Sequence, residues 1–165
     1  MQPQTSDPAA LFNRIVEESL PSRSGVAAWR ALLHAHATLM RRLELDLSEA
    51  TGLALADFDV LAQLALAGGE LRMTDLANRA LISRSGMTRR INRLLDQGLV
   101  RRANVDGDAR GVVVALTDQG VTRLAETAPV HVRGVMELFV SQLDEQELAA
   151  LKSALDKVTV DCAFG

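Results

Sequence analysis

The chain has 165 residues, of which 48% are hydrophobic and 24% charged, and its formal net charge at pH 7 is -3. This length favours one domain, and the composition is that of an ordinary globular protein. No run approaches the roughly 20 apolar residues of a membrane helix, and the N-terminus lacks the features of a secretory signal, so we expect no membrane partner. The single cysteine, Cys162, cannot form an internal disulfide, which fits a cytoplasmic location.

The first part of the chain is predicted to be helical after a disordered tail over residues 1–6. Asp7 and Pro8 have the types preferred at a helix start, so we expect a short helix that ends before Pro21. A long helix is expected from about Val26 to Glu49, because apolar residues recur along it at alternating spacings of 3 and 4. That spacing is typical of a helix that packs along another helix, and it indicates a partner chain. The residues of this stripe are Val26, Trp29, Leu33, His36, Met40, Leu43 and Leu47.

A pair of short helices is predicted after a further helix over Ala56–Ala67, which the glycines at 68 and 69 terminate. We expect Thr74 to cap the first, TDLANRAL, and Ser83 or Ser85 to begin the second, RSGMTRRINRLLDQ. Only a brief turn separates them. Two short helices, a tight turn and a basic second helix are typical of a helix-turn-helix.

The second short helix has a polar outer side. Its apolar residues, Ile91, Leu94 and Leu95, share one face, so Thr88, Arg89 and Arg93 are expected to face outward. Between positions 81 and 110 the chain has seven arginines against three aspartates, although the protein as a whole is acidic. A local basic surface of this kind favours a polyanionic partner, and an ordinary solvated helix face is the alternative.

A β-hairpin is predicted directly after the basic helix, with strands over Val100–Val105 and Gly111–Leu116 and an Asp-Gly turn signal between them. A hairpin in this place is a wing, and its tip can reach a DNA minor groove. A narrow minor groove attracts arginine, which gives Arg110 at the tip a physical use. Asp108 would hold a neighbouring guanidinium by a charge-assisted hydrogen bond.

The end of the chain is predicted to be helical again. We expect Thr117 to cap a helix that runs to about Phe139. Asp144 and Glu147 have the spacing of a capping box, which predicts a last helix to about Val160.

Motifs for catalysis or for metal and cofactor binding are missing from the sequence. The three histidines do not have metal-ligand spacing, and no nucleophile, phosphate-binding or dinucleotide motif is present. We therefore expect a protein that is not an enzyme and that has no cofactor or metal. His36 on the apolar stripe is either a core or interface histidine or a wall of a small-molecule pocket. Asp57 and Asp59 are interpreted as charges near a helix N-terminus.

The segment from Arg72 to Gly120 resembles the MarR family of bacterial transcriptional regulators. The similarity rests on Thr88-Arg89, Arg93-Leu94, Gly98-Leu99-Val100, Asp108-x-Arg110 and Leu116-Thr117. It extends more loosely over Val26–Val160. The predicted helix before Val26 is an addition to the usual start, as in some urate-responsive members, but it contains Phe12 where those members have a tryptophan.

The resemblance implies a fold that is mainly α with a small β-hairpin wing (α+β), a winged helix-turn-helix with an N- and C-terminal helical dimerisation region. A single domain would cover 7–160, with dimerisation helices at about 7–49 and 118–160 and a DNA-binding region at about 53–117. The implied function is that of a homodimeric repressor that binds a palindromic operator in double-stranded DNA. Many members release DNA when a small, often aromatic, ligand binds.

The family motif also implies roles for individual residues. On the second short helix, Arg84, Ser85, Thr88 and Arg89 would meet the major groove. The full set expected to bind DNA is Arg72, Thr74, Ser83, Arg84, Ser85, Thr88, Arg89, Arg93, Asp108 and Arg110. A ligand pocket is expected to contain Trp29, His36, Met40 and Asp59. The alternative is a winged-helix protein-interaction module without DNA binding, which would have no need for a basic hairpin tip.

Overall fold

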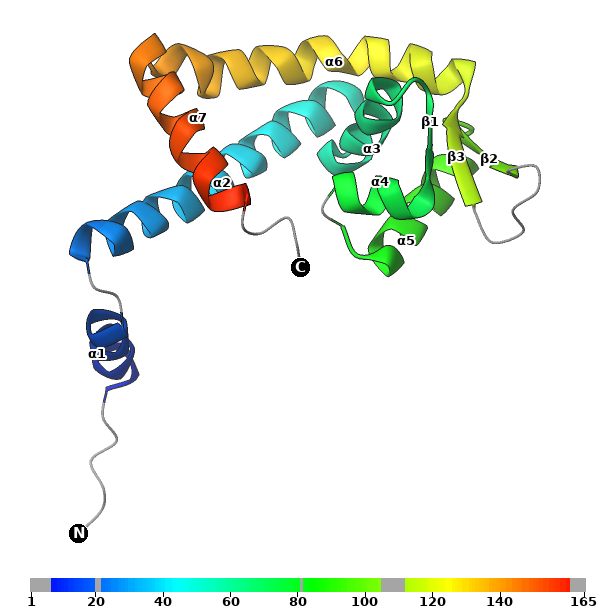
Figure 1. Cartoon of the computed structure of the whole chain (residues 1–165). Helices are drawn as coiled ribbons and strands as arrows, with labels where there is room; N and C mark the ends of the chain where they lie inside the picture. The colour runs from blue at the N-terminus through cyan, green and yellow to red at the C-terminus, as the bar shows by residue number, and fades with distance from the viewer. Residues whose placement is uncertain (1–6, 20–21, 81, 105–111, 161–165) are drawn as a thin grey trace. The chain divides into compact units, whose positions relative to one another are not determined.

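The computed structural model describes residues 7–19, 22–80, 82–104 and 112–160 (Figure 1). The chain divides into two compact units, Met1–Arg41 and Arg42–Gly165. Its described part is mainly helical with one small antiparallel sheet, as the sequence predicts. Among the described residues, no helix combines the length and the hydrophobicity needed to cross a membrane.

The first unit contains helix α1, Pro8–Ser19, and the start of the long helix α2, Arg23–Thr51. Asp7 caps α1 as predicted, because its Oδ1 accepts a hydrogen bond from the backbone N–H of Ala9 at 3.1 Å. Helix α2 begins earlier than the expected Val26, because the Ser22 hydroxyl accepts from the N–H of Gly25 at 3.1 Å and acts as its cap.

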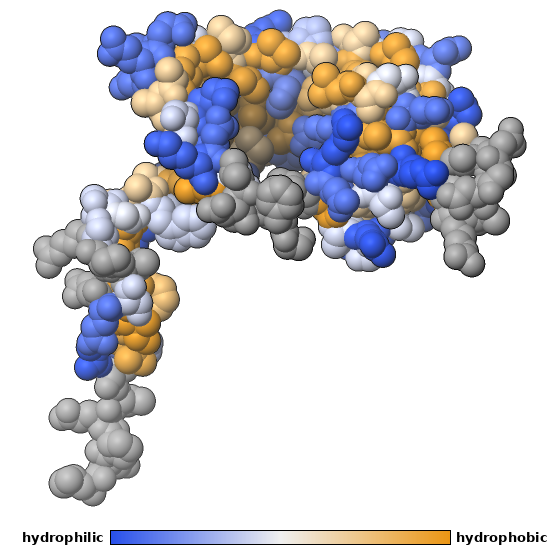
Figure 2. All heavy atoms as spheres, viewed as in Figure 1, coloured by the Kyte–Doolittle hydropathy of each residue, from blue (hydrophilic) through white to orange (hydrophobic). Residues whose placement is uncertain are grey.

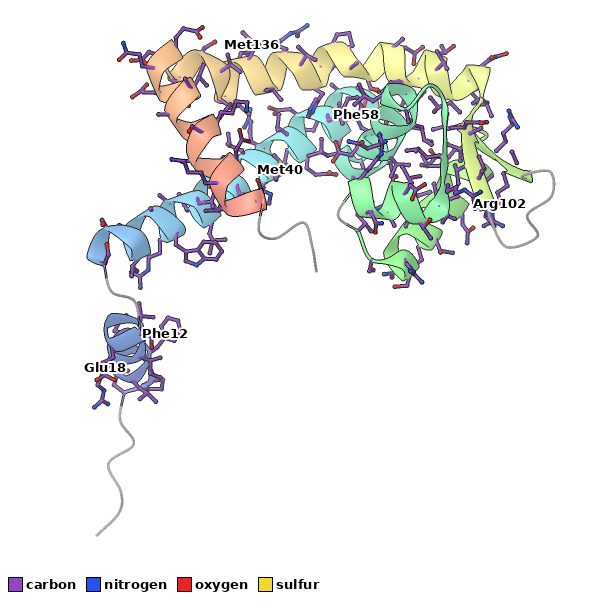
Figure 3. All side chains as sticks on the ribbon, in the orientation of Figure 1. Phe12, Glu18, Met40, Phe58, Arg102 and Met136 are labelled. Carbon is purple, nitrogen blue, oxygen red and sulfur yellow. The ribbon has the colours of Figure 1, made fainter. Side chains whose placement is uncertain are left out.

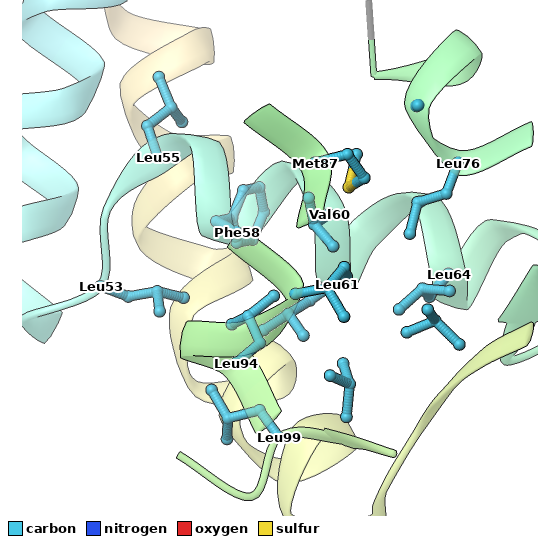
Figure 4. Packing of buried hydrophobic residues seen from close by; sticks show 14 of the residues in the cluster. Leu53, Leu55, Phe58, Val60, Leu61, Leu64, Leu76, Met87, Leu94 and Leu99 are labelled. Carbon is cyan, nitrogen blue, oxygen red and sulfur yellow. The ribbon is translucent and has the colours of Figure 1, made fainter. Parts of the chain in front are cut away.

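The second unit contains the helices that form the core. Helices α3 (Leu55–Leu66), α4 (Met73–Arg79) and α5 (Arg84–Asp96) bury their apolar sides against each other and against the sheet (Figure 4). Full burial of one such side chain stabilises the fold by about 1.5–3 kcal/mol. The side chains with no exposed surface include Leu61, Leu64, Leu76, Met87, Ile91, Leu94 and Val114.

The sheet has three strands, β1 (Glu70–Arg72), β2 (Val100–Asn104) and β3 (Val112–Leu116), in the order β1-β3-β2. All pairings are antiparallel, with Val114 opposite both Leu71 and Arg102. The sequence predicts β2 and β3. The segment between them, with the predicted turn and hairpin tip, lies outside the described residues.

Strand β1 was not predicted, and it changes how α4 begins. Gly68 and Gly69 have φ angles of +87° and +104°, which turn the chain out of α3 and into the strand. Pairing with β3 holds Arg72 in extended backbone, so α4 starts at Met73 and Arg72 is its N-cap residue. The prediction that Thr74 caps this helix is wrong, because Thr74 already lies in its first turn.

Helix α6, Asp118–Leu138, follows the sheet. Thr117 caps it as predicted, because its hydroxyl accepts from the Gly120 N–H at 3.0 Å and also donates to the Gly98 carbonyl at 2.6 Å. Gly120 is pressed against the chain that leaves α5: a Cβ on it would lie 2.0 Å from the carbonyl oxygen of Leu99. This junction ties the start of α6 to the end of α5.

A short 3-10 helix, Val140–Gln142, leads to the last helix, α7, Glu145–Val160. The predicted capping box is present. The Asp144 carboxylate accepts from the Glu147 N–H at 2.8 Å, and the Glu147 carboxylate accepts from the Asp144 N–H at 2.9 Å.

Several helices expose large apolar side chains. On α1 and α2 these include Phe12, Trp29 and Leu33, and on α6 and α7 they include Val132, Met136 and Val158. Figure 2 shows hydrophobic residues at the surface of both units, and Figure 3 labels Phe12 on α1 and Met136 on α6. Apolar surface of this kind marks helix faces that can pack against another molecule.

Candidate nucleic-acid interface

A tight turn joins α4 and α5, as the sequence predicts for a helix-turn-helix. The Ser83 hydroxyl accepts from the Gly86 N–H at 3.2 Å and caps α5, so Ser83 rather than Ser85 begins this helix. Gly86 fits closely, because a Cβ on it would lie 2.9 Å from Cγ2 of Ile82 and 3.1 Å from the Ser83 hydroxyl. The turn thereby fixes where α5 starts and which of its faces is buried.

The outer face of α5 presents the residues predicted to read DNA. Arg84, Ser85, Thr88, Arg89 and Arg93 are all exposed, while Met87, Ile91 and Leu94 between them are buried. The Thr88 hydroxyl donates to the Arg84 carbonyl of its own helix at 2.9 Å. Arg84 and Arg89 make no ion pair within the described part of the chain, so their guanidinium groups are available to a ligand.

Asp57 binds the other two arginines of α5, and sequence reasoning missed this role. Its side chain is 3% exposed, and its Oδ1 accepts from Nη1 of Arg90 at 3.3 Å and from Nη2 of Arg93 at 3.0 Å. The interpretation of Asp57 as a helix-terminal charge is therefore incomplete. The signal in the sequence is a lone acid between the buried Leu55 and Phe58, matched by two arginines three residues apart.

Arginines 89, 90 and 93 line a hollow of about 420 Å³ together with Ile82 and Gly86. Three guanidinium groups contribute to its wall, which extends from the turn before α5 to the last turn of that helix. An anionic group such as a phosphate fits this chemistry better than a neutral one, because arginine offers several N–H donors in a planar fork.

A hydrogen bond ties the wing to α5. Nη2 of Arg102, on strand β2, donates to the side-chain oxygen of Asn92 at 2.7 Å (Figure 3). Because Asn92 lies on the exposed side of α5, this contact sets the position of the wing stem relative to the same helix face. The predicted wing residues Asp108 and Arg110 lie outside the described residues, so their roles stay predictions.

The remaining residues expected to bind DNA lie around α4. Arg72 ends β1 and is exposed, and Thr74 is exposed in the first turn of α4. Neither lies on α5, because both lie at the start of α4, at the end of that helix opposite to the turn. Their contact with DNA stays a prediction.

The residues expected to form a ligand pocket fall in both units. Trp29, His36 and Met40 lie on α2 in the first unit, and each is exposed, Trp29 to 57% and Met40 to 38%. Asp59 lies on α3 in the second unit. Exposure rules out a buried core position for His36 within its own unit, and the pocket stays a prediction.

Asp59 has an unusual electrostatic setting. The residue keeps part of its surface in solvent, but partial burial of the carboxyl raises its pKa, against the lowering effects of His131 and Arg90. The centroid of the His131 ring lies 4.6 Å from that of the Phe58 ring, and its Nδ1 is buried without a hydrogen-bond partner in the described part of the chain. Titratable side chains of α3, α5 and α6 thus lie close enough together to interact.

Comparisons with known proteins agree with this geometry. The model of the MarR family matches residues 51–111, which include α3 to α5 and the strands β1 and β2. The HTH-type transcriptional regulator PecS of Dickeya dadantii is 31% identical over 108 residues, and the match spans 64% of the length of each protein.

Solved structures extend the similarity to most of the chain. AbsC, a MarR family transcriptional regulator from Streptomyces coelicolor, is 31% identical, with a TM-score of 0.80 over 87% of this chain and 97% of its own. Sco3205 from the same organism, also a MarR family transcriptional regulator, was solved in complex with DNA. It is 30% identical, with a TM-score of 0.79 over 85% of this chain and 92% of its own.

Proposed function

The chain belongs to the MarR family of transcriptional regulators, and on that premise we propose that it is a homodimeric repressor that binds a palindromic site in double-stranded DNA. The observation that carries the proposal is the outer face of α5. There, the guanidinium groups of Arg84 and Arg89 are exposed beside Ser85 and Thr88, on a helix whose other face is locked into the core. A rigid helix with free donors on one side suits the DNA major groove.

The side-chain types match the chemistry of base edges and phosphates. Arginine donates two hydrogen bonds to O6 and N7 of guanine, and hydroxyl groups bind several bases or a phosphate. We assign Arg89 and Thr88 to base reading, and Ser85 and Arg84 to the entry of α5 into the groove. Arg72, Thr74 and Ser83 would contact the backbone near α4, and Arg110 would enter the minor groove with Asp108 orienting it.

Dimerisation accounts for the exposed apolar side chains of the outer helices. Residues of about 7–49 and 118–160 would pack against a second copy, and about 53–117 would form the DNA-binding region. A two-fold dimer would place two copies of α5 roughly 34 Å apart, one turn of DNA, and would therefore require a palindrome. The single tryptophan, Trp29, is 57% exposed and would become covered.

The experiment selects bound sites from random DNA and then measures affinities for the selected site at one fixed salt concentration. Arg89→Ala should cost about 1–3 kcal/mol at one base position, because a bidentate contact is lost. Arg110→Ala should instead relax the preference for A·T-rich flanks. Arg133→Ala, an exposed arginine on α6, is the control and should bind like the wild type. Failure to select any site would favour the protein-interaction module.

We also assign a small aromatic effector to the dimerisation side of the protein, near Trp29, His36 and Met40. An effector can weaken DNA binding only if its affinity differs between the free and the DNA-bound states. Aromatic acids should therefore change Trp29 fluorescence and lower the affinity for the selected DNA together. If no acid does both, these residues serve only in helix packing.

A further inference from the structure

The arginines of α5 fall into two groups that differ in their freedom. Arg84 and Arg89 extend into solvent without an ion pair in the described part of the chain. Arg90 and Arg93, three residues apart on one side of the helix, both donate to the same oxygen of Asp57. A random solvated face would not sort its arginines in this way.

Asp57 is a fixed point to which these side chains are attached. It lies in the first turn of α3 between Leu55 and Phe58, which are both in the hydrophobic core. The packing of α3 therefore fixes the backbone of Asp57, and its buried carboxylate has little room to change position. At 3.0 Å, the contact with Nη2 of Arg93 is the shorter of its two hydrogen bonds.

The contact with Asp57 restrains Arg93 but leaves part of its side chain accessible to a ligand. Its side chain remains 52% exposed, whereas that of Arg90 is 29% exposed. A guanidinium has five N–H donors, and the bond to Asp57 uses one of those on Arg93. Arg93 also lines the hollow to which Arg89, Arg90 and Gly86 contribute. A long side chain restrained before binding loses less conformational freedom when it meets its target.

We propose that Asp57 is a positioning residue for DNA recognition, which holds Arg93, with Arg90 behind it, in the orientation in which Arg93 contacts the operator. This inference rests on the proposed function. Asp57 itself is buried and touches no DNA. Its effect is transmitted through Arg93, and it concerns the choice between DNA sequences.

Removal of the negative charge separates this role from simple charge attraction. A carboxylate near a phosphate backbone opposes binding, so attraction alone predicts that Asp57→Asn binds all DNA more tightly. Positioning predicts that binding to unrelated DNA is kept or strengthened while binding to the operator is weakened. The ratio of the two affinities is therefore the decisive quantity.

The experiment measures both affinities for the full-length protein over a salt series, with the operator selected from random DNA. Asp57→Asn should lower the ratio by about tenfold, within the range for loss of one good base contact. Arg93→Gln should lower it similarly, and Asp57→Asn combined with Arg93→Gln should be no worse than Arg93→Gln alone. Asp96→Asn, which removes an exposed acid from the end of the same helix, should leave the ratio unchanged.

A second variant keeps the test decisive if Asp57→Asn fails to fold. Arg93→Lys keeps the charge but lacks the planar fork, so it should retain the salt dependence and lose discrimination. A wild-type ratio in a folded Asp57→Asn protein, or in both Arg93 variants, overturns the inference. A wild-type protein that does not discriminate between the operator and unrelated DNA would instead refute the proposed function.

Discussion

The helix-turn-helix core buries its apolar side chains, whereas helices outside it, such as α6, expose several of theirs. Around α3, α4 and α5 most large apolar residues are buried, with Leu66 at the end of α3 as an exposed exception, and Arg84, Arg89 and Arg93 lie at the surface (Figure 4). On α6, by contrast, Val132 is 56% and Met136 46% exposed, one turn apart. A helix face of this composition is stable in water when something covers it. The first region completes its core within one chain. In the second region, the proposed second copy would cover the exposed face.

The largest effect is expected inside the helix-turn-helix. Leu94→Ala should destabilise the protein by about 2–5 kcal/mol, because the surrounding core cannot close around the missing side chain. The loss should be the same at every protein concentration, since Leu94 packs within its own chain. Urea unfolding at two concentrations a hundredfold apart measures both quantities. A loss that depended on concentration would place part of this core at an interface.

A smaller effect is expected from substitutions on α6, and it concerns the oligomeric state of the protein. The combined change Val132→Lys and Met136→Lys should shift the protein towards the monomer and abolish the dependence of its Tm on concentration. These two residues lie on one helix face, so two charges there would oppose a second copy. Sedimentation at micromolar concentration gives the oligomeric state directly.

The control for the α6 variant is Thr122→Lys, which adds a charge at an exposed polar position of the same helix. It should sediment like the wild type. If the double variant also sediments like the wild type, the exposed apolar face of α6 is not a dimer interface. A molecule other than a second copy would then have to cover that face.

The smallest effect concerns Asp59, where α3 meets charges from its neighbours. Burial raises the folded-state pKa of this carboxyl above 3.8, its ordinary value, so the folded protein holds its proton to higher pH than the unfolded chain does. The contribution of Asp59 to stability therefore falls as the pH rises through the folded pKa. Asp59→Asn should raise the Tm slightly at pH 7, and the gain should shrink as the pH falls. A lower Tm at pH 7 would mean that attraction to Arg90 and His131 outweighs burial.

The main helices could be predicted from the sequence because their signals are local. Periodic apolar residues and side-chain caps at Asp7, Ser83, Thr117 and Asp144 indicate where helices begin, and the structure confirms all four caps. Strand β1 could not be predicted in this way. It is three residues long, and pairing with β3 rather than its own pattern makes it extended.

The candidate site was predictable only on its exposed side. The outward position of Thr88, Arg89 and Arg93 follows from the helical period, which is a property of α5 alone. The contact of Arg93 with Asp57 joins residues far apart in the chain and depends on how α3 packs. No local sequence pattern specifies such packing. The sequence alone therefore indicates only that Asp57 lies near the start of a helix.

The junction at Gly120 connects the long helix α6 to the segment between α5 and β2. The start of this helix is held to the chain that leaves α5, because the Thr117 N–H donates to the Leu99 carbonyl at 3.2 Å and the Thr117 hydroxyl donates to the Gly98 carbonyl at 2.6 Å. The 21 residues of α6 span about 30 Å, so a rotation of the helix by about 5° about its start would displace its far end, Leu138, by about 3 Å. Strand β2 begins directly after Leu99, and α5 ends at Asp96, shortly before it. If α6 rotates, this junction would carry the rotation to β2 and to the end of α5.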